Sequence, residues 1–340
     1  MPDCSTQLAG LELKNPVICG AGEVTMTPGQ LRAMVDAGAA AVVAKSTNES
    51  AAARAQLRSA EYAALDPRWM PASDPAAAGV SLLNRSGLVD VPFDEWVEIL
   101  AAADAYAADR DSYVIASLIP ADLERACQMA MAIEDAGIRC LELNIGAPHG
   151  REAPAGSIET IDDGGRAAEV VGRVRRAVGM PLLVKLTADG ADPLPIARAA
   201  HEAGADALVL AGRQLGFLPD PRSRRPLLGS FAAIGGGWAL PVTLRWIAKA
   251  RAELGADVSL VATNGVRSGE DVVRCLLSGA RAVEVYTAVH HEGQAGLVRI
   301  VSELDRFAQS EGIERLTDLL GQAADARLSY AQVAAMKGDE

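Results

Sequence analysis

Residues Cys140-Leu141-Glu142-Leu143-Asn144-Ile145-Gly146-Ala147-Pro148-His149-Gly150 form an apolar run that leads directly into a loop of Gly and Pro. The run is typical of a strand that is buried on both faces, as in a parallel sheet. Asn144 stands where this strand ends. Because α/β enzymes carry their chemistry on the loops that follow strands, the stretch predicts a strand with a functional group at its end.

Seven further apolar runs of this kind are spaced along the chain, which makes eight expected strands. Segments with helical periodicity lie between them, and several end at a Gly just before the next strand, as at Ala136-Gly137 and Ser278-Gly279. Eight alternating strands and helices predict an α/β fold, a TIM (β/α)8 barrel with its functional face at the strand C-termini. A doubly wound sheet is the alternative. The expected strands lie in 16–22, 41–47, 113–118, 141–146, 182–187, 207–212, 259–265 and 282–287, and helices in 28–37, 123–136, 165–178, 193–203, 240–254 and 268–278.

Two connections are longer than a loop between a strand and a helix requires. Residues 46–112 contain several Pro, and residues 213–237 are rich in Arg, Pro and Gly. Long loops on the top face of a barrel usually build a lid or a pocket wall. Because no linker interrupts the chain, we expect one domain over 1–340, with the barrel over about 10–305 and closing helices over 306–340.

Composition narrows the class of protein and its partners. Half of the residues are hydrophobic and 4% are aromatic, which suits a soluble globular protein with a core of Ala, Val, Leu and Ile. The net charge of −12 argues against nucleic acid and anionic membranes as partners, although solubility alone explains it. The five Cys residues form no C-x-x-C pair, so we expect no metal or iron–sulfur site. With no signal-peptide layout and no membrane span, the expected location is the cytoplasm.

The ends of the last two expected strands indicate a phosphate site. Asn264-Gly265 follows the seventh strand and Tyr286-Thr287 follows the eighth. The loops after these two strands are the usual phosphate site of this barrel, and Gly lets a backbone N–H approach a phosphate closely. Gly235-Gly236-Gly237 offers a third flexible approach. Each Gly run alone is typical of an ordinary turn, and only their combination favours a phosphate.

Lys45 and Lys185 each end an expected strand among apolar residues. Because an unpaired buried ammonium is costly, a Lys at the barrel mouth is expected to meet a negative charge or the edge of a ring. A Lys that extends to solvent at the rim is the alternative for each.

The motifs, taken in order, resemble the dihydroorotate dehydrogenase family over about residues 8–305. The nearest resemblance is to the FMN- and pyrimidine-binding barrel of dihydropyrimidine dehydrogenase. The motifs that carry it are Asn15-Pro16, Ala21-Gly22, Ala44-Lys45-Ser46, Leu83-Asn84, Glu142-Leu143-Asn144, Val184-Lys185-Leu186-Thr187, Gly235-Gly236, Thr263-Asn264-Gly265 and Tyr286-Thr287-Ala288.

The resemblance implies an FMN-dependent oxidoreductase of the barrel class. In this family a hydride passes between the substrate and flavin N5, while a side chain on the opposite face moves a second proton. Substrate contacts are implied for Asn84 and Asn144, with Asn144 between flavin and substrate. The implied FMN contacts are Ala21, Gly22, Lys45, Ser46, Asn144, Lys185, Gly212, Gly236, Gly237, Asn264, Gly265, Tyr286 and Thr287.

The loop after Asn144 departs from the family pattern. Dihydroorotate dehydrogenases have Ser-Cys-Pro or Ser-Ser-Pro there, whereas Ile145-Gly146-Ala147-Pro148 offers no proton acceptor. In dihydropyrimidine dehydrogenases the base is a Cys further along this loop, and a count from Asn144 puts Thr160 at that place. Neutral Thr is a poor base unless it is activated. The candidate catalytic residues are therefore Thr160 and Ser157, while His149 matches the family's Pro-His-Gly and is expected only to position the loop.

A second departure follows the sixth strand, where pyrimidine-using relatives carry Asn-Thr and this chain has Gly212-Arg213. Loss of a fitted amide leaves part of a pyrimidine edge unpaired, so pyrimidine affinity is expected to be low. Arg213 is suited to bind a carboxylate or phosphate of the substrate, and a solvated loop Arg is the alternative.

We therefore expect an FMN-dependent oxidoreductase that oxidises or reduces a C–C bond of a small polar substrate, anionic if Arg213 binds it. It is expected not to be an authentic pyrimidine dehydrogenase. The alternatives are an FMN- or phosphate-ligand-binding barrel without redox turnover, and a non-flavin lyase with Lys185 as a Schiff-base residue. The electron acceptor is expected to be soluble or a separate electron-transfer subunit, and the family resemblance implies a homodimer.

Overall fold

Eight parallel strands close into a barrel in the order β10-β15-β16-β3-β4-β7-β8-β9. The computed structural model describes residues 2–50, 53–54, 60–77, 79–146, 161–187, 189, 192–212 and 214–338. The TIM barrel prediction is confirmed, and the doubly wound alternative is wrong because the sheet has no edge: every strand has two neighbours, and the last barrel strand, β16, pairs with the first, β3. All eight expected strands are present: β3 Val17–Cys19, β4 Ala41–Val43, β7 Tyr113–Leu118, β8 Leu141–Asn144, β9 Leu182–Lys185, β10 Ala207–Leu210, β15 Ser259–Thr263 and β16 Ala282–Val285.

Alternation along the strands decides which side chains enter the barrel. In β9, Leu182 and Val184 pack in the layer between barrel and helices, whereas Leu183 packs in the barrel interior. Lys185 follows Leu183 by two residues and therefore points inward. By the same alternation, Glu142 of β8 and Glu284 of β16 point inward, because their apolar neighbours on both sides face the helices.

The N-terminal hairpin closes the end of the barrel away from the strand C-termini. Its strands are β1 (Thr6–Leu8) and β2 (Leu11–Leu13), which pair antiparallel. Leu8, Leu11 and Leu13 are buried against the interior layer of the barrel. Each such side chain contributes about 1.5–3 kcal/mol by burial, so the hairpin seals this end and leaves the other open.

The helices surround the barrel, and the predicted ones lie where the sequence indicated. Local signals set their ends: α8 begins after Ser268, whose side chain accepts a hydrogen bond from Asp271 N, and ends at Gly279 in the left-handed conformation. The helices are α1 Pro28–Asp36, α3 Phe93–Ala108, α4 Leu123–Asp135, α5 Gly164–Ala177, α6 Leu194–Glu202, α7 Leu240–Leu254, α8 Gly269–Ser278, α9 Thr287–Glu292, α10 Gln294–Ser310, α11 Gln322–Asp325 and α12 Tyr330–Gly338.

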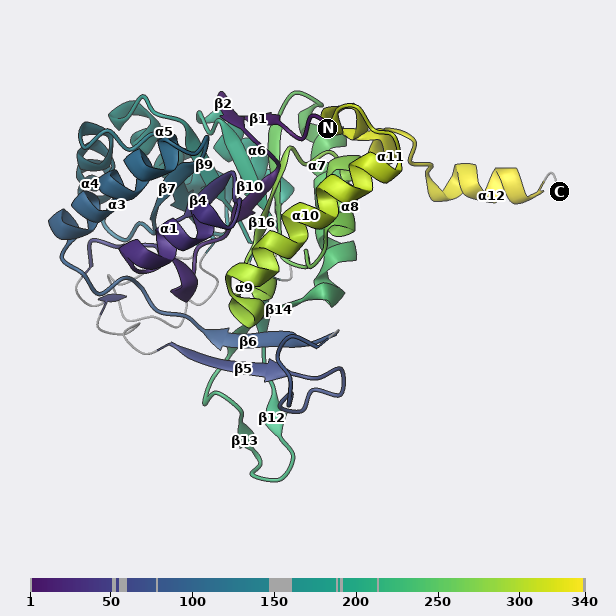
Figure 1. The fold of residues 1–340 in the computed structure, drawn as a ribbon, viewed down its shortest axis with the longest axis horizontal. Coiled ribbons are helices and arrows are strands. Elements are labelled where there is room, and N and C mark those ends of the chain that lie inside the picture. The colour runs from purple at the N-terminus through teal and green to yellow at the C-terminus, as the bar shows by residue number, and fades with distance from the viewer. Residues whose placement is uncertain are drawn as a thin grey trace.

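The two long connections meet in a second sheet beside the barrel mouth (Figure 1). This antiparallel sheet has the order β11-β14-β6-β5, with bounds Gln214–Gly216, Ala232–Gly236, Ser81–Arg85 and Glu61–Leu65. The sequence predicted only loops here, because the strands have three to five residues without regular alternation of buried and exposed positions, and β11 and β14 contain Gly. The first connection also contains α3, which packs on β7. A small hairpin, β12 (Pro219–Asp220) and β13 (Arg225–Pro226), extends from the second connection.

Within the described part of the chain, no helix combines the length and the apolar character that crossing a bilayer requires.

Candidate functional site

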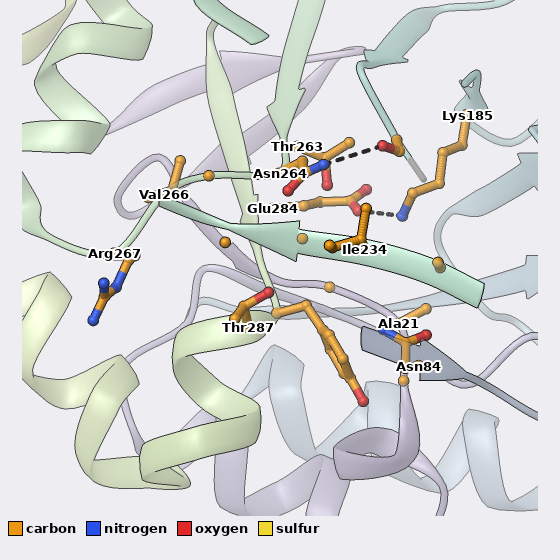
Figure 2. A pocket seen from close by; sticks show the side chains of 18 of the residues that line it. Ala21, Asn84, Lys185, Ile234, Thr263, Asn264, Val266, Arg267, Glu284 and Thr287 are labelled. Carbon is orange, nitrogen blue, oxygen red and sulfur yellow. Dashed lines mark hydrogen bonds and ion pairs between the residues drawn. The ribbon is translucent and has the colours of Figure 1, made fainter. Parts of the chain in front are cut away.

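A pocket opens between the C-terminal ends of the barrel strands and the second sheet, as Figure 2 shows. Its walls combine segments that are far apart in the sequence and that the barrel brings together. They are residues 20–23 after β3, Lys185 of β9, Gly212 after β10, residues 263–267 at the end of β15, Glu284, Tyr286 and Thr287 from β16 and α9, and Asn84 with residues 233–236 from the second sheet.

The three segments predicted to form a phosphate site lie against one another. A Cβ atom on Gly235 would lie 3.1 Å from Asn264 Oδ1 and 3.4 Å from Thr287 Oγ1. Asn264 itself is in the left-handed region with φ 80°, and its Nδ2 donates to Gly212 O over 3.4 Å. Gly265 has φ +98°, and a Cβ there would lie 2.4 Å from the backbone N of Leu240. Only Gly fits this position. Together, Gly235, Asn264, Gly265 and Thr287 form a cradle at one wall of the pocket.

Lys185 ends β9 inside the pocket and contacts two buried carboxyl groups. Its Nζ lies 3.3 Å from Glu142 Oε2 and forms an ion pair with Glu284 Oε2, which Figure 2 marks. Glu142 is 0% and Glu284 2% exposed. Burial alone would lower the pKa of Lys185, but the charges of the two glutamates outweigh it and raise that pKa. Lys185 is therefore a protonated cation at neutral pH.

Lys45, just past the end of β4, lies in a different arrangement. It is 3% exposed, and its Nζ donates to Glu23 Oε1 over 2.9 Å and to Ser86 Oγ over 3.2 Å. Glu23 lines the pocket, whereas Lys45 is not one of its lining residues. Burial would raise the pKa of Glu23, but the charge and hydrogen bond of Lys45, with those from Gly87 N and the Tyr286 hydroxyl, lower it. The pocket therefore meets a carboxylate here rather than the ammonium.

Tyr286 connects the barrel to the second sheet. A Cβ on Gly22 would lie 1.8 Å from Cε2 of Tyr286, so the ring rests directly on the backbone of that Gly. The Tyr286 hydroxyl is 3.2 Å from the Tyr62 hydroxyl and 3.3 Å from His290 Nδ1. The Tyr62 ring stacks on His290 with centroids 4.3 Å apart. These contacts fix the sheet over the pocket.

Several other predicted residues lie close to the pocket without lining it. Ser46 Oγ is 2.9 Å from Ser117 Oγ, which in turn donates to Glu142 Oε1 over 3.1 Å. Asn144 Oδ1 accepts from Gly146 N over 3.1 Å at the end of β8. Gly237 packs against the side chain of Arg267 rather than against the cavity.

Other predicted residues belong to the pocket wall itself, namely Ala21, Gly22, Asn84, Gly212, Gly236, Asn264, Gly265 and Thr287. Among them Asn84 is distinctive, because its Oδ1 is buried and has no hydrogen-bond partner within the described residues. Thr160, Ser157, His149 and Arg213 lie outside the described residues.

Four charged residues of the site were not predicted to act there: Glu23, Glu142, Glu284 and Arg267. The signal for two of them is present in the sequence, since Glu142 and Glu284 are single acidic residues between the apolar residues of buried strands. Such a residue is unusual unless it is paired, and it therefore marks a site. Arg267 has no comparable signal; Figure 2 shows it and Lys185 on opposite sides of the pocket.

Known proteins resemble this chain over nearly its full length. The family model described as dihydroorotate dehydrogenase matches residues 4–307. The catalytic subunit of dihydroorotate dehydrogenase B (NAD(+)) of Thermoplasma acidophilum is 27% identical over 95% of this chain and 99% of its own. A putative dihydroorotate dehydrogenase A (fumarate) of Solibacter usitatus is 31% identical, covering 94% and 98%. The B-type catalytic subunit of Methanothermobacter thermautotrophicus is 30% identical, covering 94% and 98%.

Proposed function

Because this chain belongs to the dihydroorotate dehydrogenase family, we propose that the pocket at its barrel mouth binds FMN together with a small polar substrate. The family consists of FMN-dependent oxidoreductases that act on a C–C bond of a small molecule, and this chain is one of them. The resemblance seen in the sequence is thereby confirmed. The residue roles that follow are proposals.

The observation that carries the proposal is the fit of the pocket to a phosphorylated ring. The cradle of Gly235, Asn264, Gly265 and Thr287 offers close backbone approach and polar side chains to a phosphate ester. Asn84 Oδ1, buried and without a partner in the described chain, is suited to accept from an N–H of a bound ligand. These residues would hold FMN, and Arg267 adds a positive charge to the same wall.

FMN, when bound, supplies the hydride chemistry. The residues of this chain supply position, charge and protons. Lys185 is held protonated by two carboxyl groups, so it donates hydrogen bonds and positive charge to a bound ring. A protonated Lys is a poor nucleophile, and this argues against the lyase alternative in which Lys185 forms a Schiff base.

The second proton needs a carrier that the start of the loop does not provide. Ile145 is buried, and Gly146 packs on the backbone of residues 186–187, so neither accepts a proton. We therefore assign the carrier to Thr160 or Ser157. Thr160→Val is expected to slow flavin reduction by roughly 10²–10⁴ if Thr160 is the carrier. A normal rate in that variant with a slow Ser157→Ala would move the role to Ser157.

The substrate we favour is a small molecule with a carboxylate for Arg213. Gly212-Arg213 replaces the strand-six amide of the pyrimidine-using relatives, so pyrimidine affinity should be low. Dihydroorotate is the first compound to test, because the relatives are named for it. Arg213→Ala should raise KM for an acidic substrate while FMN stays bound.

The electron acceptor is proposed from the names of the same relatives. Two of them are named catalytic subunits, so we assign this chain a soluble acceptor or a separate electron-transfer subunit. A homodimer is proposed as well, and light scattering of the purified protein tests it.

The decisive experiment is the absorbance spectrum of the purified protein. The protein should show the band of oxidised flavin, release FMN on denaturation, and bleach anaerobically with its substrate. A colourless protein that FMN cannot reconstitute would contradict the proposal. Flavin that no candidate substrate bleaches would favour the binding barrel without turnover.

A matched pair of variants locates the FMN in the cradle. Gly265→Asp should abolish FMN retention, because it introduces a side chain at φ +98° against Leu240 and a negative charge beside the phosphate. Gly255→Asp is the control: it has φ +110° and open space around a Cβ, at the end of α7. Both variants place a side chain at a positive φ, so FMN lost from both would point to unfolding rather than to the cradle.

A further inference from the structure

The carboxyl group of Glu284 has two oxygens in different surroundings. Oε2 pairs with Lys185, whereas Oε1 has no hydrogen-bond partner among the described residues. The residue is 2% exposed and belongs to the pocket wall, where Figure 2 shows it beside Lys185. A buried polar atom without a partner is costly, so this oxygen is suited to a ligand in the pocket.

Glu284 and Glu142 share one cation. Glu142 Oε2 is 3.3 Å from Lys185 Nζ, and its Oε1 already accepts from the Ser117 hydroxyl. One ammonium balances one carboxylate, and two buried carboxylates in contact do not both ionise easily. Glu142 has the additional donor, so the proton belongs on Glu284. Burial, joined by the charge of Glu142 and opposed by Lys185, raises the pKa of Glu284 to about 8.

Among the described residues, Cys19, Glu23 and His290 also have shifted pKa values near this cluster, and none of the three changes its charge between about pH 7 and 9. Burial raises the pKa of Cys19, on the neighbouring strand β3, to about 12. On β15, the other neighbouring strand, Thr263 lies opposite Glu284. In the pocket wall, the ion pair with Lys45 outweighs burial and lowers the pKa of Glu23. On α9, burial lowers the pKa of His290.

We propose that the protonated carboxyl of Glu284 donates a hydrogen bond from Oε1 to FMN, and that FMN binding weakens when this proton is lost. The inference rests on the proposed function, because it names a group that FMN meets. Ionisation releases the proton to water, turns the donor into an acceptor, and changes the charge of the three-residue cluster from neutral to −1. Loss of a hydrogen bond of this kind corresponds to roughly tenfold in affinity.

The test is the Kd of the apo-protein for FMN, measured by quenching of flavin fluorescence from about pH 6.5 to 9.5. In the wild type, Kd should be constant at the acid end and rise roughly tenfold as the pH passes the pKa of Glu284. Glu284→Gln should lose the rise, because its side chain does not titrate. Its amide oxygen accepts from Lys185 while its NH₂ donates to the pocket, as the protonated acid does.

Two further variants separate this effect from a general change in the pocket. Glu142→Gln removes the like charge, so the rise should move to lower pH. Glu23→Gln is the matched control, because it changes a carboxyl of the same pocket whose pKa is lowered. Glu23→Gln can change the Kd for FMN at every pH, but the rise in Kd should still occur at the same pH as in the wild type.

A wild-type Kd that is independent of pH, or a rise that persists in Glu284→Gln, overturns the inference while FMN binding stands. If Glu284→Gln does not fold, as judged by circular dichroism, the wild-type and Glu142→Gln curves decide. An unmoved rise in Glu142→Gln then overturns it. A wild type that binds no FMN at any pH contradicts the proposed function and removes this inference with it.

Discussion

Lys45 and Lys185 are alike in sequence and differ in what they present to the pocket. Lys185 is the last residue of β9 and Lys45 lies just past β4, and each contacts carboxyl groups. Lys45 contacts one, that of Glu23, which lines the pocket although Lys45 does not. Lys185 contacts two, those of Glu142 and Glu284, and lines the pocket together with Glu284. Whether the Lys itself lines the pocket, rather than the type of strand-end residue, therefore decides whether a ligand meets its ammonium.

The Lys45 cluster (Lys45 and Glu23) and the Lys185 cluster (Lys185, Glu142 and Glu284) also respond differently to pH. The pKa of Glu23 is lowered, because Lys45 and the hydrogen bonds to its carboxylate outweigh burial. The pKa of Glu284 is raised to about 8, because burial and Glu142 outweigh Lys185. Lys45 therefore stabilises Glu23 as a carboxylate, whereas Lys185, which two carboxyl groups share, leaves Glu284 protonated.

The largest effect is expected when each Lys is removed in turn. Lys185→Met leaves two buried carboxyl groups without a cation, which should lower the free energy of unfolding by about 3–5 kcal/mol at neutral pH. Lys45→Met leaves Glu23 with donors from Gly87 N and the Tyr286 hydroxyl, so its loss should be about 1–2 kcal/mol. Urea unfolding of both variants checks this.

The double variant Lys185→Met/Glu142→Gln serves as the control for that comparison. It removes the positive charge together with one negative charge, and should recover part of the stability lost in Lys185→Met. Equal losses for Lys45→Met and Lys185→Met would mean that the two clusters do not differ as described.

The pH dependence of stability should have opposite signs in the two clusters. Glu23 has a folded pKa below its ordinary value of 4.5, so its contribution is present above 4.5 and is lost as pH falls through the folded pKa. Glu284 has a folded pKa of about 8, so its contribution is present below 4.5 and is lost as pH rises through 8.

Unfolding in urea over a pH series tests these signs. Compared with the wild type, Glu23→Gln should flatten the loss of stability at the acid end, and Glu284→Gln the loss between 4.5 and about 8. If the wild-type slope of stability against pH that each substitution removes had the same sign for Glu23 and Glu284, the assignment of a carboxylate to Glu23 and a protonated acid to Glu284 would be contradicted.

The smallest effect is expected from the hydroxyl groups that support each cluster. Ser117→Ala removes a donor to Glu142, and Ser86→Ala removes an acceptor of Lys45. Each should cost about 1 kcal/mol. Only Ser117→Ala should also change the pH dependence that Glu284 causes, since Ser117 belongs to that cluster. If Ser86→Ala also changed the pH dependence that Glu284 causes, the two clusters would be coupled, and the contrast drawn between them would not hold.

Much of the fold follows from local patterns. The eight barrel strands were readable as apolar runs, and helix ends as caps such as Ser268 and Gly279. The second sheet was not readable, because β6 and β14 pair only after the barrel brings two distant loops together. Short, half-exposed strands carry little alternation of their own.

Only part of the site was predictable from the sequence, for the same reason. The Gly cradle and both Lys residues were predicted from their strand-end positions, which are local. Their partners were not, because Glu284 lies on a strand three places from β9 in the barrel and reaches Lys185 across the interior. Strand order and inward alternation are both needed to predict that contact, and neither is present in one segment of sequence.

The most direct test of the central claim is the affinity of Lys185→Met and Lys45→Met for FMN at neutral pH, measured on the folded fraction. If the Lys185 cluster faces the cofactor, Lys185→Met should bind FMN roughly 10- to 100-fold more weakly than the wild type, through loss of a charged hydrogen bond. Lys45→Met should stay within about threefold, because Lys45 does not line the pocket, whereas its partner Glu23 does. A loss in Lys45→Met that equals or exceeds that in Lys185→Met would contradict the account.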